Sequence, residues 1–368
     1  MDSIILKVKD SVDLFLCDET YIMAYYMNTR QKKTFKVNKE LITLLEIIDG
    51  KKSLSDIHKI MNNLYGIEYN SVDAVINSMI ENRIITVVNR NHDILLQEDI
   101  ERYDRQINYF TEFLDSEEEG LRAQKRIMDS KILIFGCGAT GGDIALELVM
   151  AGVQNITLYD YDTVENSDVS RHMYFTDKDI GKIKVDALKK QLELINSKVN
   201  ITCISQSMKP DTNICDLIKK QDFVVNTLDE PYIGYTSSKI SRICVQYSIP
   251  HFIGGGFDAH LASTGEIIIP YITPCVECYA THFKEKLKNW KPKKHPVKTR
   301  YTEIGGLASM SLFSASFAAI EIIKYIAGLT ETKNSFKVRG ELLFTDMSLT
   351  YLKVSKNPNC PICGGKNK

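Results

Sequence analysis

KILIFGCGATGGDIALELVMAGVQNITLYDYD, at residues 131–162, joins two apolar strand patterns through a glycine-rich turn and a helical pattern. The β-branched and aromatic run at 132–135 predicts a buried parallel strand. A G-x-G-x-x-G turn follows, and its glycines are Gly136, Gly138 and Gly141. After a helix with one apolar face, a second strand at 156–159 ends at Asp160. This order predicts an α/β fold with a Rossmann-like domain.

Each part of this pattern suits the binding of a nucleotide. Glycines let the backbone approach phosphates, and the helix N-terminus offers N–H groups and partial positive charge. An acid at the end of the second strand, here Asp160, can accept hydrogen bonds from ribose hydroxyls. The alternative is a tight turn in an α/β sheet that binds nothing. The complete order of strand, glycines, helix, strand and acid favours the nucleotide site.

The composition is that of a globular protein of two or three domains, with 368 residues, 44% apolar residues and a net charge of −1. This charge attracts neither nucleic acid nor a membrane surface. No stretch of about 18 residues is apolar without charges, and the N-terminus MDSIILKVKD lacks the apolar run of a signal peptide. Four of the nine cysteines form two C-x-x-C pairs, which favours a reducing cytoplasm.

Residues 1–90 have the pattern of a separate, small α+β domain. Strands are expected at residues 11–17, 20–28, 32–37 and 84–88. Three helices are expected between the last two strands: the first is capped by Asn38, the second starts at Ser53 and the third starts near Asn70. Asp56 lies three residues after Ser53, as in a capping box.

This order of elements resembles a winged-helix fold, and in particular the PqqD-like domains that bind leader peptides of ribosomally made natural products. The alternative is a DNA-binding winged helix, but the third helix carries Asp73 and Glu81 and few basic residues. A leader peptide could add as a strand to the edge at 32–37. Phe35 and Leu41 would then line side-chain pockets, although both could equally be core residues.

The two C-x-x-C pairs are suited to a single metal ion. Their four thiols belong to Cys275, Cys278, Cys360 and Cys363. Two such pairs match tetrahedral Zn²⁺, and four protein ligands leave no open position for chemistry. We therefore expect a structural zinc that clips the C-terminus to the nucleotide domain, rather than four free thiols.

Further motifs follow the second strand. The chain reads YDTVENSDVSRH at 161–172 and DIGKIK at 179–184, so it contains D-x-D, an Arg eleven residues past the first Asp, and G-x-x-K. RYDRQ precedes the nucleotide domain at 102–106, and VVNTLD lies at 224–229. With these motifs the chain from about residue 98 resembles the ThiF/MoeB/HesA adenylating family, relatives of ubiquitin-activating enzymes. Residues 91–128 would be a helical linker, and 129–368 the adenylation domain.

The resemblance implies ATP and Mg²⁺ as cofactors and a role for each motif. The glycines would line the phosphates, Asp160 and Asp162 would hold the nucleotide, and Arg171 and Lys184 would neutralise the phosphates. Arg105 would reach the site from the second subunit of a homodimer, and Asp229 would bind Mg²⁺.

The chain departs from the family at two places. The family usually has Asn-Leu-x-Arg-Gln where this chain has Asp168-Val-Ser-Arg-His172. An Asp near phosphates is repulsive unless it faces Mg²⁺ or a positive side chain. The segment 298–305 lacks the cysteine that thioester-forming members carry there. The Lys-rich insert at 283–300 could be a lid or a solvated loop.

An N-terminal recognition domain before an adenylation domain resembles the peptide-antibiotic branch of this family. The expected function is ATP-dependent activation of a carboxylate on a precursor peptide. Glutamate side chains with cyclisation, as in pantocin A biosynthesis, are favoured over microcin C-type attachment of a nucleotide to the peptide C-terminus. Activation of a ubiquitin-like sulfur carrier, a nicotinamide dehydrogenase and a non-catalytic peptide-binding module are the rival hypotheses.

Overall fold

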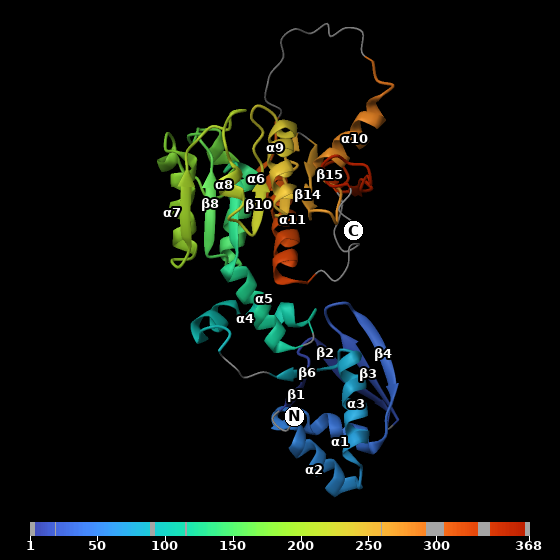
Figure 1. Ribbon diagram of the computed structural model, residues 1–368. Helices are drawn as coiled ribbons and strands as arrows, with labels where there is room; N and C mark the ends of the chain where they lie inside the picture. Colours follow the sequence, from blue (N-terminus) through green and yellow to red (C-terminus); the bar gives the residue numbers. More distant parts are fainter. Residues whose placement is uncertain are drawn as a thin grey trace. The chain divides into compact units, whose positions relative to one another are not determined.

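The computed structural model describes residues 4–18, 20–88, 93–114, 116–258, 260–291, 305–329 and 339–364. The chain divides into two compact units, residues 1–125 and 126–368 (Figure 1). The boundary between them falls within helix α5 (Glu117–Asp129).

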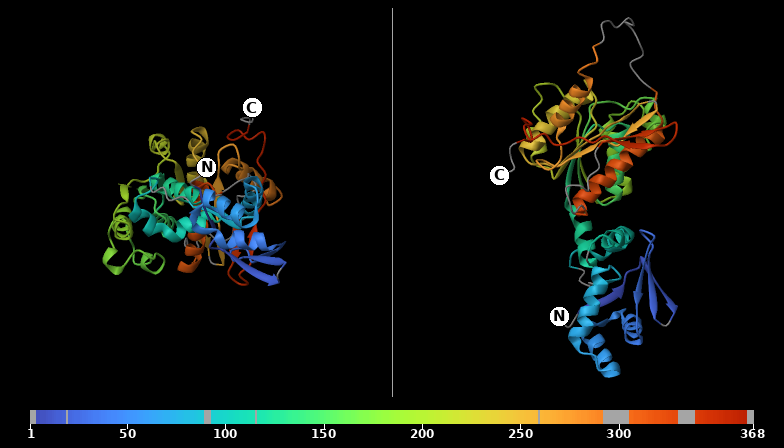
Figure 2. Two further views of the ribbon diagram at one scale, coloured as in Figure 1. Left: turned by 90° about the horizontal axis from the view of Figure 1, so that it is seen from below. Right: turned by 90° about the vertical axis from the view of Figure 1, so that its right-hand side faces the viewer.

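The described part of the first unit contains two three-stranded antiparallel sheets, followed or flanked by helices. One sheet has the order β2 (Val12–Asp18), β3 (Tyr21–Tyr26), β4 (Gln31–Lys36). The other has the order β5 (Asp49–Ser53), β1 (Ile5–Val8), β6 (Ile85–Val88). The helices after β4 are α1 (Lys39–Ile47), α2 (Leu54–Tyr65) and α3 (Tyr69–Glu81). In two perpendicular views α3 runs beside the sheet β2–β3–β4 (Figures 1 and 2).

The local signals in the sequence explain most of these elements. The Asn38 side chain accepts the Leu41 N–H, and Ser53 and Asp56 form the predicted capping box. The predicted strands and helices are therefore confirmed. Strands β1 and β5 were not expected. The β5 sequence DGKKS is polar and contains Gly50 at φ +74°, so its composition does not indicate a strand. It becomes a strand only by pairing with β1.

The linker region is helical, as predicted, over the part that the structure describes. It forms α4 (Gln97–Thr111), which is kinked at Tyr103, and then α5. Residues 91, 92 and 115 of this region lie outside the described residues.

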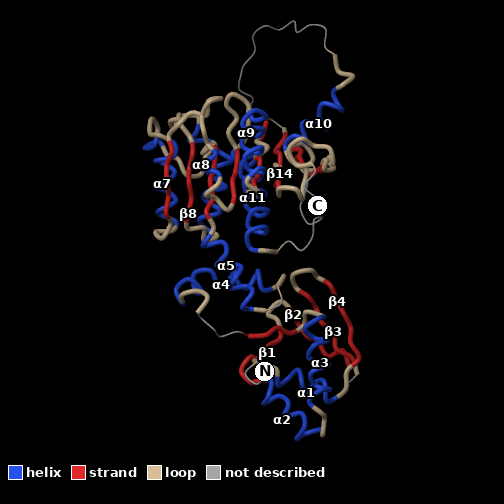
Figure 3. The backbone as a smooth tube through the Cα atoms, viewed as in Figure 1, coloured by secondary structure: helices blue, strands red, loops and turns tan. Residues whose placement is uncertain are grey.

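The second unit is built on a six-stranded sheet flanked by helices (Figure 3). Its strand order is β14 (Glu266–Ile268), β11 (His251–Ile253), β10 (Phe223–Asn226), β7 (Lys131–Phe135), β8 (Asn155–Tyr159), β9 (Asn200–Ile204). Every neighbouring pair is parallel except β11 with β14. The Rossmann-like α/β fold is therefore confirmed.

Helices cover both faces of this sheet. On one side α6 (Ala139–Met150) packs against α7 (Lys184–Ile195) and α11 (Ala308–Ala327). Leu133 and Phe135 of β7 belong instead to a core cluster with residues of α8 (Cys215–Ile218) and α9 (Ile233–Gln246). Because side chains alternate along a strand, β7 is buried on both faces, as its continuous apolar sequence predicts.

A second sheet and one further helix complete the unit. The sheet has the order β12 (Phe257–Asp258), β13 (Leu261–Ser263), β15 (Gly340–Leu343), β16 (Leu349–Tyr351). Helix α10 (Val276–Leu287) begins directly after Cys275 and includes the start of the insert at 283–300, of which residues 292–300 lie outside the described residues. Among the described helices, only α11 is long and apolar enough to cross a membrane, and a core helix passes the same test.

Candidate nucleotide site, zinc site and apolar groove

The glycine-rich turn at the end of β7 needs each of its glycines for a different reason. Gly136 has φ +90°, which strains any other L-residue. A Cβ on Gly141 would lie 2.0 Å from the Gly136 carbonyl oxygen. A Cβ on Gly138 would meet no atom within 4 Å, so open space adjoins the backbone there. Such space beside the N-terminus of α6 is what an approaching phosphate requires.

Two residues that sequence reasoning missed hold this turn in place. The Thr227 hydroxyl lies 3.0 Å from the carbonyl oxygens of both Phe135 and Gly136, and shares its one hydrogen between them. The Tyr174 hydroxyl donates to the Gly138 carbonyl oxygen at 2.9 Å. A signal for this contact is GG at 141–142, because a Cβ on residue 142 would lie 1.8 Å from the Tyr174 oxygen.

The acids of the predicted site follow the carboxyl ends of neighbouring strands. The turn follows β7, Asp160 follows β8, and Asp229 lies three residues past β10. Parallel strands that end at one edge place such residues together. Asp160 is 4% exposed, and its oxygens accept the Cys137 N–H at 2.6 Å and the Asp162 N–H at 2.9 Å. These bonds fix the carboxylate and leave each oxygen one lone pair for a ligand.

The D-x-D and G-x-x-K motifs are joined by backbone hydrogen bonds. Lys184 donates its N–H to the Asp162 carbonyl oxygen at 2.9 Å, and Val164 donates to the Lys182 carbonyl oxygen at 2.8 Å. Gly181, at φ +83°, donates to the Val164 carbonyl oxygen at 2.8 Å. Lys184 is thereby placed at the first turn of α7 with its side chain beside the acids of the D-x-D loop.

The two predicted phosphate-binding cations already pair with acids. The Lys184 ammonium lies 3.4 Å from a carboxylate oxygen of Asp162 and 3.4 Å from one of Asp168. The Arg171 guanidinium lies 3.0 Å from the other Asp168 oxygen. Burial alone would lower the pKa of Lys184, but the surrounding carboxylates outweigh it and raise this pKa, so the ammonium stays charged.

The departures from the family pattern, Asp168 and His172, are both buried. The Asp168 side chain is 2% exposed and that of His172 is 1% exposed. The His172 ring donates from Nδ1 to the Asp168 carbonyl oxygen at 2.7 Å, and its Nε2 has no partner among the described residues. Burial lowers the pKa of His172, so the ring is neutral and serves to hold the Asp168 backbone.

Two of the predicted site residues are exposed. The side chain of Asp229 makes no hydrogen bond or ion pair within the described part of the chain. Its neighbour Glu230 accepts a short hydrogen bond from the Tyr161 hydroxyl, which ties this segment to the D-x-D loop. Arg105 lies in the first unit, exposed on α4. Its role in a partner's site stays a prediction.

The four predicted zinc ligands are gathered and buried. Their sulfur atoms all lie within 4.8 Å of one another. Three of the sulfur–sulfur distances are 3.9 Å for Cys275–Cys278, 3.5 Å for Cys275–Cys360 and 3.5 Å for Cys278–Cys363. These values are far too long for disulfides and match the roughly 3.8 Å between ligands of a tetrahedron with Zn–S bonds of about 2.3 Å. The Asn357 N–H also donates to the Cys278 sulfur at 3.4 Å, and such a bond orients a thiolate toward its metal.

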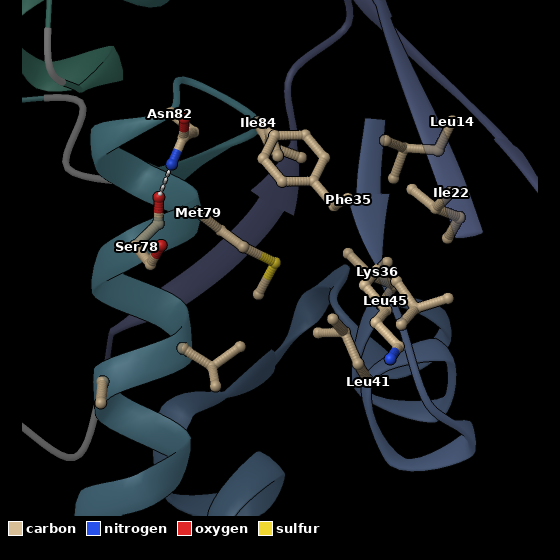
Figure 4. A pocket seen from close by; sticks show the side chains of 13 residues that line it. Leu14, Ile22, Phe35, Lys36, Leu41, Leu45, Ser78, Met79, Asn82 and Ile84 are labelled. Atoms are coloured by element: carbon tan, nitrogen blue, oxygen red, sulfur yellow. Dashed lines mark hydrogen bonds between the residues drawn. The ribbon is translucent and has the colours of Figure 1, made fainter. Parts of the chain in front are cut away.

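The first unit contains an apolar groove of about 370 Å³ between α3 and the strand β4 with the start of α1 (Figure 4). Phe35 and Leu41, the two residues singled out in the sequence, both line it. On the α3 side it is lined by Ala74, Val75, Ser78, Met79 and Asn82. Phe35 and Leu41 also pack against the core of the unit, so they are at once core-edge and groove residues.

Comparison with known proteins places this nucleotide site in a family. The model of the ThiF family matches residues 103–362. The chain belongs to the ThiF family. The vegetative HesA protein of Trichormus variabilis is 31% identical over 275 residues, which are 73% of this chain and 91% of that protein. The predicted resemblance is confirmed, and this ThiF-family chain is an ATP-dependent adenylating enzyme.

Solved structures share the fold over nearly the whole chain, including the first unit. Escherichia coli MccB has a TM-score of 0.72 at 20% identity and covers 99% of this ThiF-family chain and 100% of its own. PaaA has a TM-score of 0.69 at 23% identity, and the match covers 95% of this ThiF-family chain and 100% of the PaaA chain. MccB is a microcin C7 biosynthetic enzyme and has been solved in complex with N-formylated MccA. At these identities the likeness shows a common fold.

Proposed function

We propose that this enzyme activates a carboxylate of a ribosomally made precursor peptide by adenylation. The observation that carries the proposal is one chain with a ThiF-family nucleotide site and an N-terminal unit that presents an apolar groove beside a strand edge that no described strand covers. The fold shared with MccB and PaaA over both units supports it. Adenylation requires chiefly positioning and charge neutralisation, which the motifs of the second unit can supply.

Each site residue has a proposed role in this reaction. A carboxylate oxygen attacks the α-phosphorus of ATP, the bond to the β-phosphate breaks, and pyrophosphate leaves. Gly136, Gly138 and Gly141 line the phosphates through backbone N–H groups, while Asp160 and Asp162 hold the ribose side of the nucleotide. Lys184 and Arg171 neutralise the developing charge, and Asp229, whose oxygens are exposed, would hold Mg²⁺, which screens the phosphates.

The groove is the proposed site for the leader segment of the peptide, and residues 1–90 the proposed PqqD-like recognition domain. Among the described strands β4 pairs only with β3, so its other edge offers unpaired backbone groups to an added strand. An apolar leader side chain would enter the groove beside Phe35 and Val75. Lys32, Lys33 and Lys36 of β4 form no ion pair with an acid among the described residues, so acidic residues flanking the apolar anchor would be favoured.

Zinc, assembly and compartment complete the proposal. The four-cysteine cluster would hold a structural Zn²⁺ that ties residues 360–363 to the start of α10. The enzyme would be a cytoplasmic homodimer in which Arg105 of each subunit completes the other's site.

Activation of glutamate side chains followed by cyclisation is the favoured chemistry. The second candidate is microcin C-type nucleotide attachment, which the MccB likeness favours, and the third is activation of a sulfur carrier.

Mass spectrometry distinguishes these outcomes. The enzyme is incubated with ATP, Mg²⁺ and the peptide encoded by a short reading frame beside its gene, and Lys184→Ala is the inactive control. Loss of water from the peptide indicates cyclisation, and gain of an AMP moiety indicates microcin C-type chemistry. A peptide that binds but never changes mass, together with turnover on a ubiquitin-like carrier, would refute the proposal.

A further inference from the structure

Asp168 stands where the family usually has Asn, and its surroundings explain how a charge is accommodated there. One oxygen pairs with the Arg171 guanidinium at 3.0 Å, and the other lies 3.4 Å from the Lys184 ammonium. That second oxygen also accepts the Glu165 N–H at 2.9 Å. The carboxylate therefore bridges the two cations that we assign to the phosphates.

The Asp168 carboxylate is fixed as well as paired. Its own N–H donates to the Glu165 carbonyl oxygen at 3.0 Å, which closes a tight turn. Its carbonyl oxygen accepts the His172 N–H at 3.0 Å and the His172 ring Nδ1 at 2.7 Å. The side chain is 2% exposed and is held by the Glu165 N–H as well as by the two cations. Asp168 is therefore a permanent negative charge in the site.

This charge changes the electrostatic balance around Lys184. Burial alone would raise the pKa of Asp168, but the Glu165 N–H and the Lys184 charge outweigh it and leave this pKa below its usual range. Asp160, Asp162 and Asp168 therefore act together on Lys184, with Arg171 as the second cation. Three carboxylates face two cations, and Glu230 adds a further negative charge that acts on Asp162, so the described cluster is net negative before any phosphate enters. An Asn in place of Asp168 would remove one of these negative charges.

We propose that Asp168 is a positioning residue that keeps Arg171 and Lys184 together before nucleotide binds, and that makes the site select ATP as its magnesium complex over the free anion. The inference rests on the proposed nucleotide site. A triphosphate without a metal is repelled by the net negative charge of this cluster. In the magnesium complex of ATP, the charge of Mg²⁺ reduces that repulsion. A structural role alone would require only an acceptor for the Glu165 N–H, which Asn also provides.

Calorimetric titration of the full chain with ATP, without peptide, tests the proposal. The measured quantity is the ratio of Kd in EDTA to Kd in Mg²⁺. In Asp168→Asn this ratio should fall about tenfold or more, the order expected for removing one unit charge from a partly buried site. The change should come mainly from tighter binding of free ATP. Asp168→Glu retains the charge and should keep the discrimination if it folds.

Asp179→Asn is the matched control. Asp179 also accepts a backbone N–H three residues earlier, from Thr176 at 3.0 Å, and pairs with Lys182 at 2.8 Å, but it does not contact Lys184 or Arg171. Its removal should leave the ratio unchanged. Asp168→Ala removes the charge and also the acceptor of the Glu165 N–H. It should therefore lower both the Kd ratio and the melting temperature.

The possible results separate the inference from the proposed function. An unchanged ratio in a folded Asp168→Asn protein that binds ATP would overturn the inference and leave the nucleotide site intact. Equal weakening of both Kd values would show a purely structural role and would also overturn it. If the unaltered chain binds ATP in neither condition, the nucleotide-site assignment itself fails. A lowered ratio in Asp168→Asn but not in Asp179→Asn supports the inference.

Discussion

Val75→Asp tests whether the groove in the first unit binds the leader peptide. Val75 lies on α3, lines the groove and is 36% exposed, so it contributes to the groove without being essential to the core. A carboxylate there would hydrate the groove and face any apolar side chain that enters. The substitution should change folding stability by only a few tenths to about 1 kcal/mol, as surface changes usually do.

The expected loss in affinity follows from the size and character of the groove. A volume of about 370 Å³ accommodates a complete Leu- or Phe-sized anchor, and most lining residues are apolar. Full burial of such a side chain is worth about 1.5–3 kcal/mol. Losing it should weaken leader binding by about one to two orders of magnitude in Kd. The affinity for ATP should not change.

Asn77→Asp provides the control for charge. Asn77 is exposed on the same helix and does not line the groove, so this variant adds the same carboxylate two residues away. Fluorescence anisotropy with a labelled leader peptide measures both Kd values, and melting temperatures verify folding. If Val75→Asp and Asn77→Asp bind the leader as tightly as the unaltered chain, the groove does not hold the anchor and the assignment of the first unit is wrong.

Three further predictions concern metal, assembly and pH. Elemental analysis should find about one zinc per chain, and Cys360→Ser should lower the melting temperature whereas Cys215→Ser should not; a zinc-free protein of undiminished stability would contradict this. Mixed Arg105→Ala and Lys184→Ala proteins should regain activity, because one hybrid site is intact, and failure despite proven subunit exchange would indicate a site within one chain. Asp143 is 1% exposed, its oxygens have no partner among the described residues, and burial raises its pKa to about 7.

For Asp143 the sign of the pH effect follows from linkage. The folded state holds its proton to higher pH than the unfolded chain does, so stability falls as pH rises from about 4 through 7. Asp143→Asn cannot ionise and should melt at a higher temperature than the unaltered chain at pH 8, with little difference at low pH. Melting curves at pH 5 and pH 8 measure this, and equal pH slopes for both proteins would refute it.

The parts of the fold that were predictable depend on short-range signals. Asn38, Ser53 with Asp56, and the glycine turn each act within a few residues, so the helix starts and the β7–α6 turn could be placed from sequence. The four-cysteine cluster was predictable across more than 80 residues only because thiol pairs have a distinctive spacing. Strand β5 was missed because its pairing with β1, not its composition, makes it a strand.

The contacts that hold the nucleotide site in place were not predictable either, because they join residues that lie far apart in the sequence. The hydroxyls of Thr227 and Tyr174 reach the glycine turn from 91 and 36 residues away. The glycine pair at 141–142 marks a close approach at this turn, but no local pattern shows which residue makes it. The sequence did mark Asp168 as a departure and indicated that it needed either Mg²⁺ or a positive side chain nearby. Only the folded loops determine that this neighbour is both Arg171 and Lys184.

These ion pairs also bear on why the site would need a residue from a second chain. Within the second unit, the acids assigned to the site outnumber its assigned bases, and Asp168 already engages both Lys184 and Arg171. An incoming triphosphate adds further negative charge to a partly buried site, where uncompensated charge is costly. Mg²⁺ supplies part of the compensation, but it does not present the fixed, paired N–H donors that a guanidinium offers to phosphate oxygens. Arg105 of a partner subunit would provide that group, so loss of Arg105 should slow turnover more than it weakens binding of the magnesium complex of ATP.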